Sequence, residues 1–152
     1  MAPIERATEE RNLRVLLIED HAVFAGATAE FLRDRGLEVR IAGSGEEGLH
    51  AARVFRPHIA LCDLHLPDMS GLDVARAFRA SPDTKDLVFA MHTSMSDLEV
   101  QSFERSLDPA VVDLFLPKPI TEERLEILLA GLTPKFGIST HRVGFPHTPK
   151  IA

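Results

Sequence analysis

Five short apolar runs recur along this chain, and a helical pattern follows each of them. Apolar runs of about four to eight residues that do not alternate with polar residues are typical of strands buried on both faces. Alternating strands and helices predict βαβ units, and hence a parallel sheet with right-handed crossovers and helices on both of its faces. We therefore expect an α/β fold, a doubly wound (βα)5 domain. The predicted strands are 15–18, 37–42, 58–62, 87–91 and 111–116.

The helical segments carry recognisable start and stop signals. The first, 21–35, stops at Gly36, a residue suited to the position after a helix. Ser44-Gly45-Glu46-Glu47 and Ser96-Asp97-Leu98-Glu99 have the form of capping boxes, in which a serine and a glutamate satisfy each other's backbone N–H groups. These boxes open the second and fourth predicted helices. The third and fifth are expected at 71–80, with Ser70 as its cap, and at 121–132.

Length and composition suggest how the chain is divided. The 152 residues suit one domain with little left over. A hydrophobic content of 45% and a charged content of 26% are those of a packed globular core. Periodicity is missing at both ends of the chain. We expect a flexible leader at 1–12, a folded domain at 13–132, and a flexible tail or linker at 133–152.

Charge and composition argue against several classes of function. A single cysteine argues against a disulfide framework and against a multi-cysteine zinc site. The net charge of −6 argues against nucleic acid or anionic lipid as the main partner. No apolar run reaches the length of a membrane span, and the first residues lack the apolar centre of a signal peptide. We therefore expect a cytoplasmic protein that contacts neither nucleic acid nor membrane.

Polar side chains follow four of the predicted strands where each one ends. Glu19 and Asp20 follow the first strand, Asp63 the third, Thr93 the fourth and Lys118 the fifth. The carboxyl ends of parallel strands share one edge, which is where open α/β sheets bind ligands. Neighbouring carboxylates repel unless a cation lies among them, and oxygen ligands suit Mg²⁺. With a lysine and a hydroxyl beside them, the pattern predicts a site for a phosphoryl group carried on a carboxylate.

Each of these residues also has a plainer interpretation. A single aspartate at a strand end is most often a turn former or a helix cap, and Asp20 could cap the helix that begins near His21. Lys118-Pro119 could be a surface turn. We favour the joint interpretation because all five polar residues fall on the same edge of the predicted sheet.

Four motifs carry these residues: LLIED at 16–20, DLHLPDMSGLD at 63–73, MHTS at 91–94 and FLPKP at 115–119. Through their order, spacing and strand context, residues 13–132 resemble the receiver domain of two-component response regulators, including the chemotaxis regulators. The resemblance implies a flavodoxin-like, five-stranded parallel sheet of order 2-1-3-4-5. It also implies that the domain takes a phosphoryl group from the phosphohistidine of a sensor histidine kinase or phosphotransfer protein.

The resemblance assigns a role to each acidic residue of the predicted site. Asp63 resembles the phosphoacceptor, and Asp20 resembles the carboxylate that binds Mg²⁺ directly. Glu19 resembles the acid that reaches the metal through water. The backbone carbonyl of His65 would complete the ligands that the protein supplies.

The remaining roles concern the phosphoryl group and the signal. Lys118 resembles the lysine that pairs with the acyl phosphate, and its bond to Pro119 is often cis in relatives. Thr93 resembles the switch hydroxyl, and Phe115 resembles the aromatic residue whose rotamer follows it. An alignment on the VFAM text would put His92 at the switch position instead; we prefer Thr93 because a hydroxyl can donate to a phosphate oxygen. A downstream protein would bind the surface of the fourth helix, fifth strand and fifth helix.

A glycine pattern in the chain suggests a different ligand. Gly43-Ser44-Gly45-Glu46-Glu47-Gly48 matches the G-x-G-x-x-G of dinucleotide sites. It follows the second predicted strand rather than the first, and it places two glutamates where a pyrophosphate would lie. We therefore interpret it as a capped helix start.

Two other functions share the aspartate chemistry. Hydrolases of the haloacid dehalogenase type also use a strand-end aspartate and Mg²⁺, but they resemble D-x-D, and His65 stands where their second acid would be. A degenerate receiver would bind partners without phosphate, which the complete set of Glu19, Asp20, Asp63 and Lys118 argues against. We expect a protein that is not an enzyme acting on an external substrate. Its chemistry would be the self-catalysed phosphorylation and dephosphorylation of Asp63.

Overall fold

The computed structural model describes residues 13–94, 96–105 and 110–132. The predicted leader at 1–12 and the predicted tail at 133–152 lie outside the described residues. Within the described part of the chain, no helix is long and apolar enough to cross a membrane.

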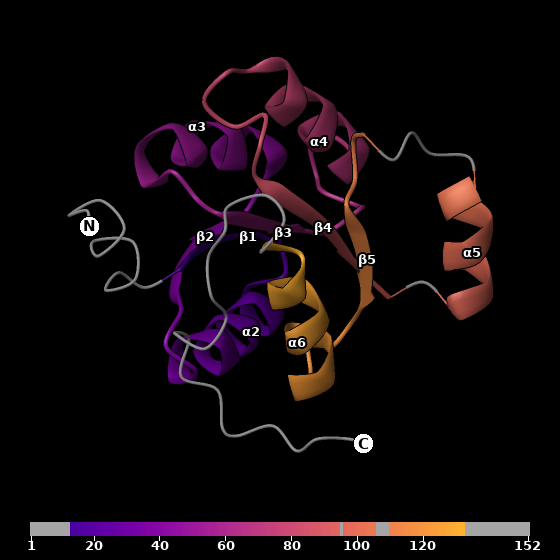
Figure 1. Ribbon diagram of the computed structural model, residues 1–152. Coiled ribbons are helices and arrows are strands. Elements are labelled where there is room, and N and C mark those ends of the chain that lie inside the picture. The colour runs from indigo at the N-terminus through magenta and orange to yellow at the C-terminus, as the bar shows by residue number, and fades with distance from the viewer. Residues whose placement is uncertain (1–12, 95, 106–109, 133–152) are drawn as a thin grey trace, which may run out of the picture.

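The centre of the molecule is a sheet of five parallel strands (Figure 1). The strands lie side by side in the order β2-β1-β3-β4-β5, which confirms the expected 2-1-3-4-5 topology. At the centre of the sheet, Ile18 lies opposite Cys62 on the neighbouring strand, and Cys62 lies opposite Met91 on the next strand. The strands are β1 (Arg14–Ile18), β2 (Glu38–Ala42), β3 (Ile59–Cys62), β4 (Val88–Thr93) and β5 (Leu114–Pro117).

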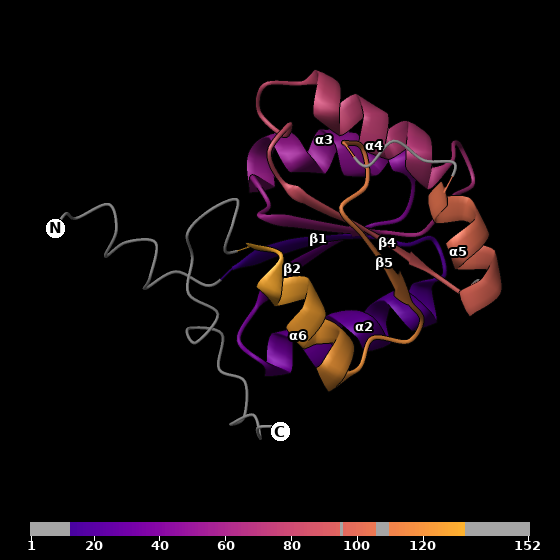
Figure 2. The same ribbon diagram turned by 45° about the vertical axis from the view of Figure 1, so that its right-hand side comes forward.

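Helices cover both faces of this sheet, as the predicted βαβ units require. Figures 1 and 2 show α3 and α4 on one face, α2 and α6 on the other, and α5 at the side where β4 and β5 run. The doubly wound prediction is therefore confirmed. The helices are α2 (Ala22–Asp34), α3 (Gly45–Phe55), α4 (Gly71–Ala80), α5 (Asp97–Arg105) and α6 (Glu122–Ala130).

Strands β1 and β3 are apolar over almost their whole length because each packs against two cores. Along β1, Val15 and Leu17 pack in the core under α2 and α6, while Leu16 and Ile18 pack in the core under α3 and α4. Side chains alternate between the faces of a strand, so a strand covered on both faces needs an unbroken apolar run.

Most of the predicted helix ends are confirmed, and one detail differs. Gly36 follows α2 with a φ of 90°, a conformation that favours glycine. Ser70 and Asp73 form a complete capping box at α4. At α3 only half of the predicted box forms, because the Glu47 carboxylate accepts from the N–H of Gly43 instead of that of Ser44.

The last strand begins later than the apolar run predicts. The run starts at residue 111, whereas β5 starts at Leu114. The Asp113 carboxylate accepts from the Phe89 N–H, and the Val111 carbonyl accepts from Arg79. These side-chain contacts hold the segment before β5 as a loop at the amino end of the sheet.

Candidate functional site

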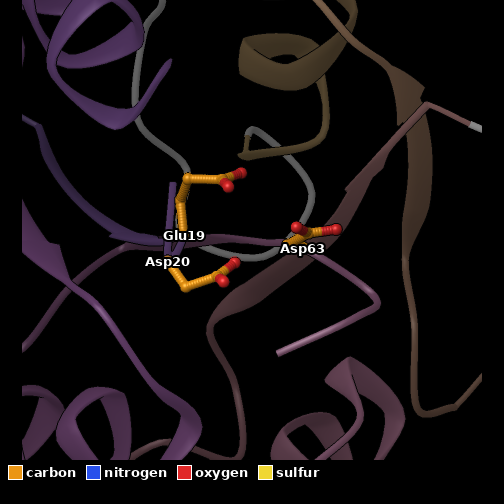
Figure 3. Close-up of side chains that lie close together, drawn as sticks. All are labelled: Glu19, Asp20 and Asp63. Atoms are coloured by element: carbon orange, nitrogen blue, oxygen red, sulfur yellow. The ribbon is translucent and has the colours of Figure 1, made fainter. Parts of the chain in front are cut away.

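Three carboxylates meet at the carboxyl edge of the sheet. Because Ile18 and Cys62 are paired, the residues that follow them in β1 and β3 also lie side by side. Glu19, Asp20 and Asp63 each offer a carboxylate oxygen within 4.8 Å of the others. Figure 3 shows all three side chains extending toward the same region. Glu19 is buried, Asp63 is half-buried and Asp20 is exposed, so the cluster runs from the interior to the surface.

One lysine partly neutralises this cluster. The Lys118 Nζ lies 2.7 Å from Glu19 Oε1 and 3.3 Å from Asp63 Oδ2. The second oxygen of Glu19 accepts from the His21 N–H at 3.1 Å. Both oxygens of Glu19 are thus engaged, whereas the Asp20 carboxylate forms no hydrogen bond or ion pair with another described residue. Three carboxylates face one ammonium group, so the site retains excess negative charge.

The negative charge of the carboxylates also affects the pKa of the buried Cys62 thiol. Burial, followed by the charges of Asp63 and Glu19, holds the pKa of Cys62 far above its usual value. The thiol therefore stays protonated, and its Sγ lies 3.3 Å from the Asp63 carbonyl oxygen. Cys62 is fully buried and belongs to the core under α3 and α4.

The turn after Asp63 depends on a glycine. The Gly71 N–H donates to the Leu64 carbonyl at 2.7 Å, and a Cβ on Gly71 would lie 2.5 Å from the Asp63 carbonyl oxygen. Such a distance excludes any side chain unless the backbone shifts. The His65 N–H donates to Asp63 Oδ1 at 3.3 Å, which orients the carboxylate. The His65 side chain itself is exposed.

Asp68, in the same turn, caps a different helix. Its two carboxylate oxygens accept from the N–H groups of Gly45 and Glu46 at 2.8 and 2.9 Å, and these bonds lower the pKa of Asp68. The first turn of α3, where the glycine pattern would have placed a pyrophosphate, thus holds a carboxylate of the chain itself. Sequence analysis missed this contact, which joins the turn after β3 to a helix 23 residues earlier.

The other two strand ends bring the remaining predicted residues to this edge. Thr93, the last residue of β4, is buried and pairs with Pro117, and its carbonyl accepts from the Lys118 N–H at 2.9 Å. The peptide bond between Lys118 and Pro119 is cis, as the resemblance implies. The Phe115 ring lies edge-on to Phe103 of α5, with centroids 5.7 Å apart.

Strand alternation separates Thr93 from His92. Met91 and Phe115 pack in the core under α3 and α4, so Thr93, two residues after Met91, lies on that face. His92 lies on the opposite face, where its ring is 5.8 Å from that of Phe24 in α2. The predicted switch residue and Phe115 therefore share one face of the sheet, and the alternative candidate does not.

His92 itself is an unusual buried residue. It is 1% exposed, and neither ring nitrogen has a hydrogen-bond partner among the described residues. Burial, then the nearby charges of Lys118 and Arg124, lower the pKa of His92 to about 3. The ring is therefore neutral at ordinary pH. The same Phe24 ring has the Lys118 Nζ 4.6 Å from its centroid.

Comparison with known families agrees with this arrangement. Residues 15–130 match the family model of the response regulator receiver domain. The matched range contains every residue of the carboxylate and lysine cluster.

Curated relatives have the same domain within longer chains. The chain is 33% identical over 107 residues to the DNA-binding response regulator MtrA of Mycobacterium tuberculosis, covering 70% of this chain and 46% of MtrA. It is 31% identical over 113 residues to the cell cycle transcriptional regulator CtrA of Caulobacter vibrioides, covering 74% of this chain and 47% of CtrA. The chain thus spans about half the length of the curated relatives it matches.

Solved structures of isolated receivers match over nearly their whole length. A CheY-like receiver domain protein from Methanospirillum hungatei superposes with a TM-score of 0.67 at 28% identity, covering 82% of this chain and 96% of the other. The chemotaxis response regulator CheY4 of Vibrio cholerae superposes with a TM-score of 0.68 at 25% identity, covering 80% and 98%. From its fold, its carboxylate cluster and these matches, the chain belongs to the response regulator receiver domain family of two-component signal transduction.

Proposed function

We propose that Asp63 accepts a phosphoryl group from the phosphohistidine of a sensor histidine kinase or phosphotransfer protein, with Mg²⁺ bound beside it. The observation that carries the proposal is the convergence of Asp63, two further carboxylates and the Lys118 ammonium at one sheet edge. Phosphoryl transfer has a loose transition state, so alignment and charge neutralisation supply most of the catalysis. Both needs are met by groups held at strand ends.

The donor set suits a hard divalent cation. Asp20 is exposed and has no partner among the described residues, which supports direct binding of the metal. Glu19 has both oxygens engaged, which supports contact through water. The backbone carbonyl of His65 and the Asp63 carboxylate would complete the ligands from the protein. When bound, Mg²⁺ supplies positive charge to the phosphoryl oxygens.

The chain's own residues perform the transfer. A carboxylate oxygen of Asp63 forms the new P–O bond while the P–N bond of the donor breaks, and its electron pair returns to the donor imidazole. The His65 N–H orients the Asp63 carboxylate. Lys118 lies at hydrogen-bond distance from Asp63 and would pair with a phosphoryl oxygen after transfer.

The signal would pass from the phosphoryl group through Thr93 to Phe115. Their position on one sheet face supports Thr93 rather than His92 as the switch residue. Phe115 touches Phe103, so a new rotamer of Phe115 would alter how α5 sits against β5. A downstream protein would then bind the surface of α5, β5 and α6, in the cytoplasm and without nucleic acid.

A labelling experiment tests the proposal. Wild type incubated with Mg²⁺ and a phosphodonor should become phosphorylated on one residue. Asp63→Asn should take up no label while keeping its fold, because the change is nearly isosteric. Asp73→Asn, an aspartate of α4 outside the cluster, is the matched control and should label normally. Label that persists at unchanged stoichiometry in Asp63→Asn would refute the assignment.

Two alternatives give different outcomes in the same experiment. A haloacid-dehalogenase-like hydrolase would turn over small phosphomonoesters, and we expect no such turnover because His65 replaces the second acid and offers Asp63 a backbone N–H. A degenerate receiver would take up no label even as wild type. We propose instead a phosphoacceptor that is not an enzyme, apart from catalysing its own phosphorylation and dephosphorylation.

A further inference from the structure

The position of the Phe24 side chain is not explained by packing in a hydrophobic core. It lies in the first turn of α2, where its backbone N–H donates to His21 Nδ1 at 3.2 Å. Its side chain is only half-buried and belongs to neither hydrophobic core. Instead, the ring contacts both the Lys118 ammonium, 4.6 Å from its centroid, and the His92 ring, whose centroid is 5.8 Å away. Phe24 therefore contacts the site lysine from α2.

Lys118 needs such a contact because its anchors change when Asp63 reacts. In the unphosphorylated protein, the ammonium is held by Glu19 at 2.7 Å and by Asp63 at 3.3 Å. Once Asp63 carries a phosphoryl group, the lysine must turn its N–H donors toward phosphoryl oxygens. A carboxylate competes for those donors. An aromatic face attracts the ammonium through its quadrupole and competes far less for its hydrogen bonds.

The ring is itself held in position. The His21 cap ties the backbone of Phe24 to the start of α2, directly after the acidic pair that follows β1. The buried imidazole of His92 packs against the ring from β4. Contacts from α2 and β4 thus hold the aromatic face against the end of the Lys118 side chain, which is 16% exposed.

We infer that Phe24 is a positioning residue that holds the Lys118 ammonium toward the acyl phosphate on Asp63. The inference rests on the proposed phosphorylation of Asp63. It adds a residue from the α2 helix to the lysine's surroundings, and it predicts that an aromatic ring is required at this position rather than apolar bulk alone.

Two variants of the full-length chain separate these requirements. Phe24→Leu keeps an apolar side chain but removes the aromatic face, and Phe24→Tyr keeps the face. Circular dichroism and thermal melting should establish that both variants are folded. The first measurement is the NMR shift of the Lys118 Cε protons, which the ring current moves upfield in the wild type. We expect the upfield shift to be retained in Phe24→Tyr and lost in Phe24→Leu.

The second measurement is the rate of phosphorylation by acetyl phosphate with Mg²⁺. We expect Phe24→Leu to lower the rate about threefold to tenfold, the effect of losing a partly desolvated cation–π contact. Phe24→Tyr should stay within about twofold of wild type, which would be rescue by the conservative variant.

The outcomes discriminate clearly. Equal rates in wild type and Phe24→Leu would overturn the inference, and so would equal losses in Phe24→Leu and Phe24→Tyr, which would indicate packing alone. A Lys118 shift insensitive to Phe24→Leu would overturn the contact itself. Wild type that takes up no label would refute the proposed function and, with it, the role of Phe24 in phosphorylation. If the wild type is phosphorylated and Phe24→Leu is phosphorylated at the same rate, only the inference about Phe24 is refuted.

Discussion

At the scale of single residues, His92 is a destabilising feature inside the sheet. Both of its ring nitrogens are buried with no partner in the described residues. Leaving a buried polar group unsatisfied costs about 1–3 kcal/mol. Among the groups near the ring, Lys118 after β5 and Arg124 from α6 oppose a positive charge on it. His92 should therefore destabilise the fold most in acid.

The sign of this effect follows from the pKa of His92, which lies at about 3 in the fold and at 6.5 in the unfolded chain. Between those values the unfolded chain binds a proton that the folded protein does not, so stability falls as the pH falls. From pH 7 to pH 5 the loss due to His92 should be about 2 kcal/mol. His92→Leu should remove it, because leucine fills a similar space without polar atoms.

Urea unfolding at several pH values checks this prediction. The stability advantage of His92→Leu over wild type should grow by that amount between pH 7 and pH 5. His50→Leu, at an exposed histidine of α3, is the control and should show no comparable growth. A constant difference between His92→Leu and wild type would mean that His92 titrates in the fold as it does in the unfolded chain.

At the scale of elements, Arg79 joins α4 to the amino ends of β4 and β5. Its guanidinium donates to the carbonyls of Lys85, Leu87 and Val111 and lies 2.8 Å from Asp113 Oδ2. The Arg79 and Asp113 side chains are only 15% and 24% exposed. A planar guanidinium can make these bonds together, and an ammonium cannot.

Arg79→Lys should therefore lower the free energy of unfolding by about 1–3 kcal/mol. Arg76→Lys is the matched control on the same helix, because its ion pair with Asp73 is exposed and 3.4 Å long. That change should cost less than about 0.5 kcal/mol. Chemical denaturation of both variants measures the difference. Equal losses would show that the carbonyl contacts of Arg79 contribute nothing.

Helix α2 also presents an exposed apolar residue beside the carboxylates. Val23 is 78% exposed and follows the acidic pair by only three residues. Val54, at the far end of α3, is 77% exposed and serves as a matched control. We expect a phosphorylated protein that reaches Asp63 to cover the start of α2, which a small donor need not do.

We therefore expect Val23→Ser to slow phosphotransfer from a phosphohistidine protein about tenfold, the loss of roughly 1.4 kcal/mol of buried apolar contact. Val54→Ser should leave that rate unchanged, and both variants should react normally with acetyl phosphate. Radiolabel transfer kinetics with the two donors provides the measurement. A Val23→Ser defect shared by both donors would place the effect in the site rather than in docking.

At the scale of the whole molecule, the unbalanced charge of the site couples metal binding to global stability. Three carboxylates surround a single ammonium at the sheet edge, so the fold carries repulsion that a divalent cation would relieve. A metal that binds only the folded state raises the melting temperature by mass action.

Mg²⁺ at ten times its Kd should stabilise the wild type by about 1.4 kcal/mol, or about 3–6 °C in melting temperature. Asp20→Asn should abolish most of this shift, and Glu19→Gln should reduce it less, because both oxygens of Glu19 are already engaged and it would reach the metal through water. Thermal melts across a Mg²⁺ titration provide the measurement. A wild-type melting temperature that stays constant to several millimolar Mg²⁺ would contradict the proposed metal site.

Much of this architecture could be predicted without coordinates. Unbroken apolar runs such as 15–18 require cover on both faces of the sheet, and alternating helices supply it, so the layers and the parallel sheet follow. Parallel strands end at one edge, and polar residues directly after those ends must therefore converge. For this reason Asp63, Asp20 and Lys118 were correctly predicted to lie together.

The remaining contacts depend on how the helices pack against the sheet. The local sequence pattern does not predict this packing. The Asp68 carboxylate caps α3 across 23 residues, and Arg79 reaches Asp113 across 34. Nothing in the local pattern around Phe24 indicates that its ring contacts Lys118. Local periodicity reports which face of an element is buried, because burial of apolar surface acts on every residue of that face. Which side chain meets which across two elements is decided by packing angles and side-chain rotamers, and these exist only in the assembled fold.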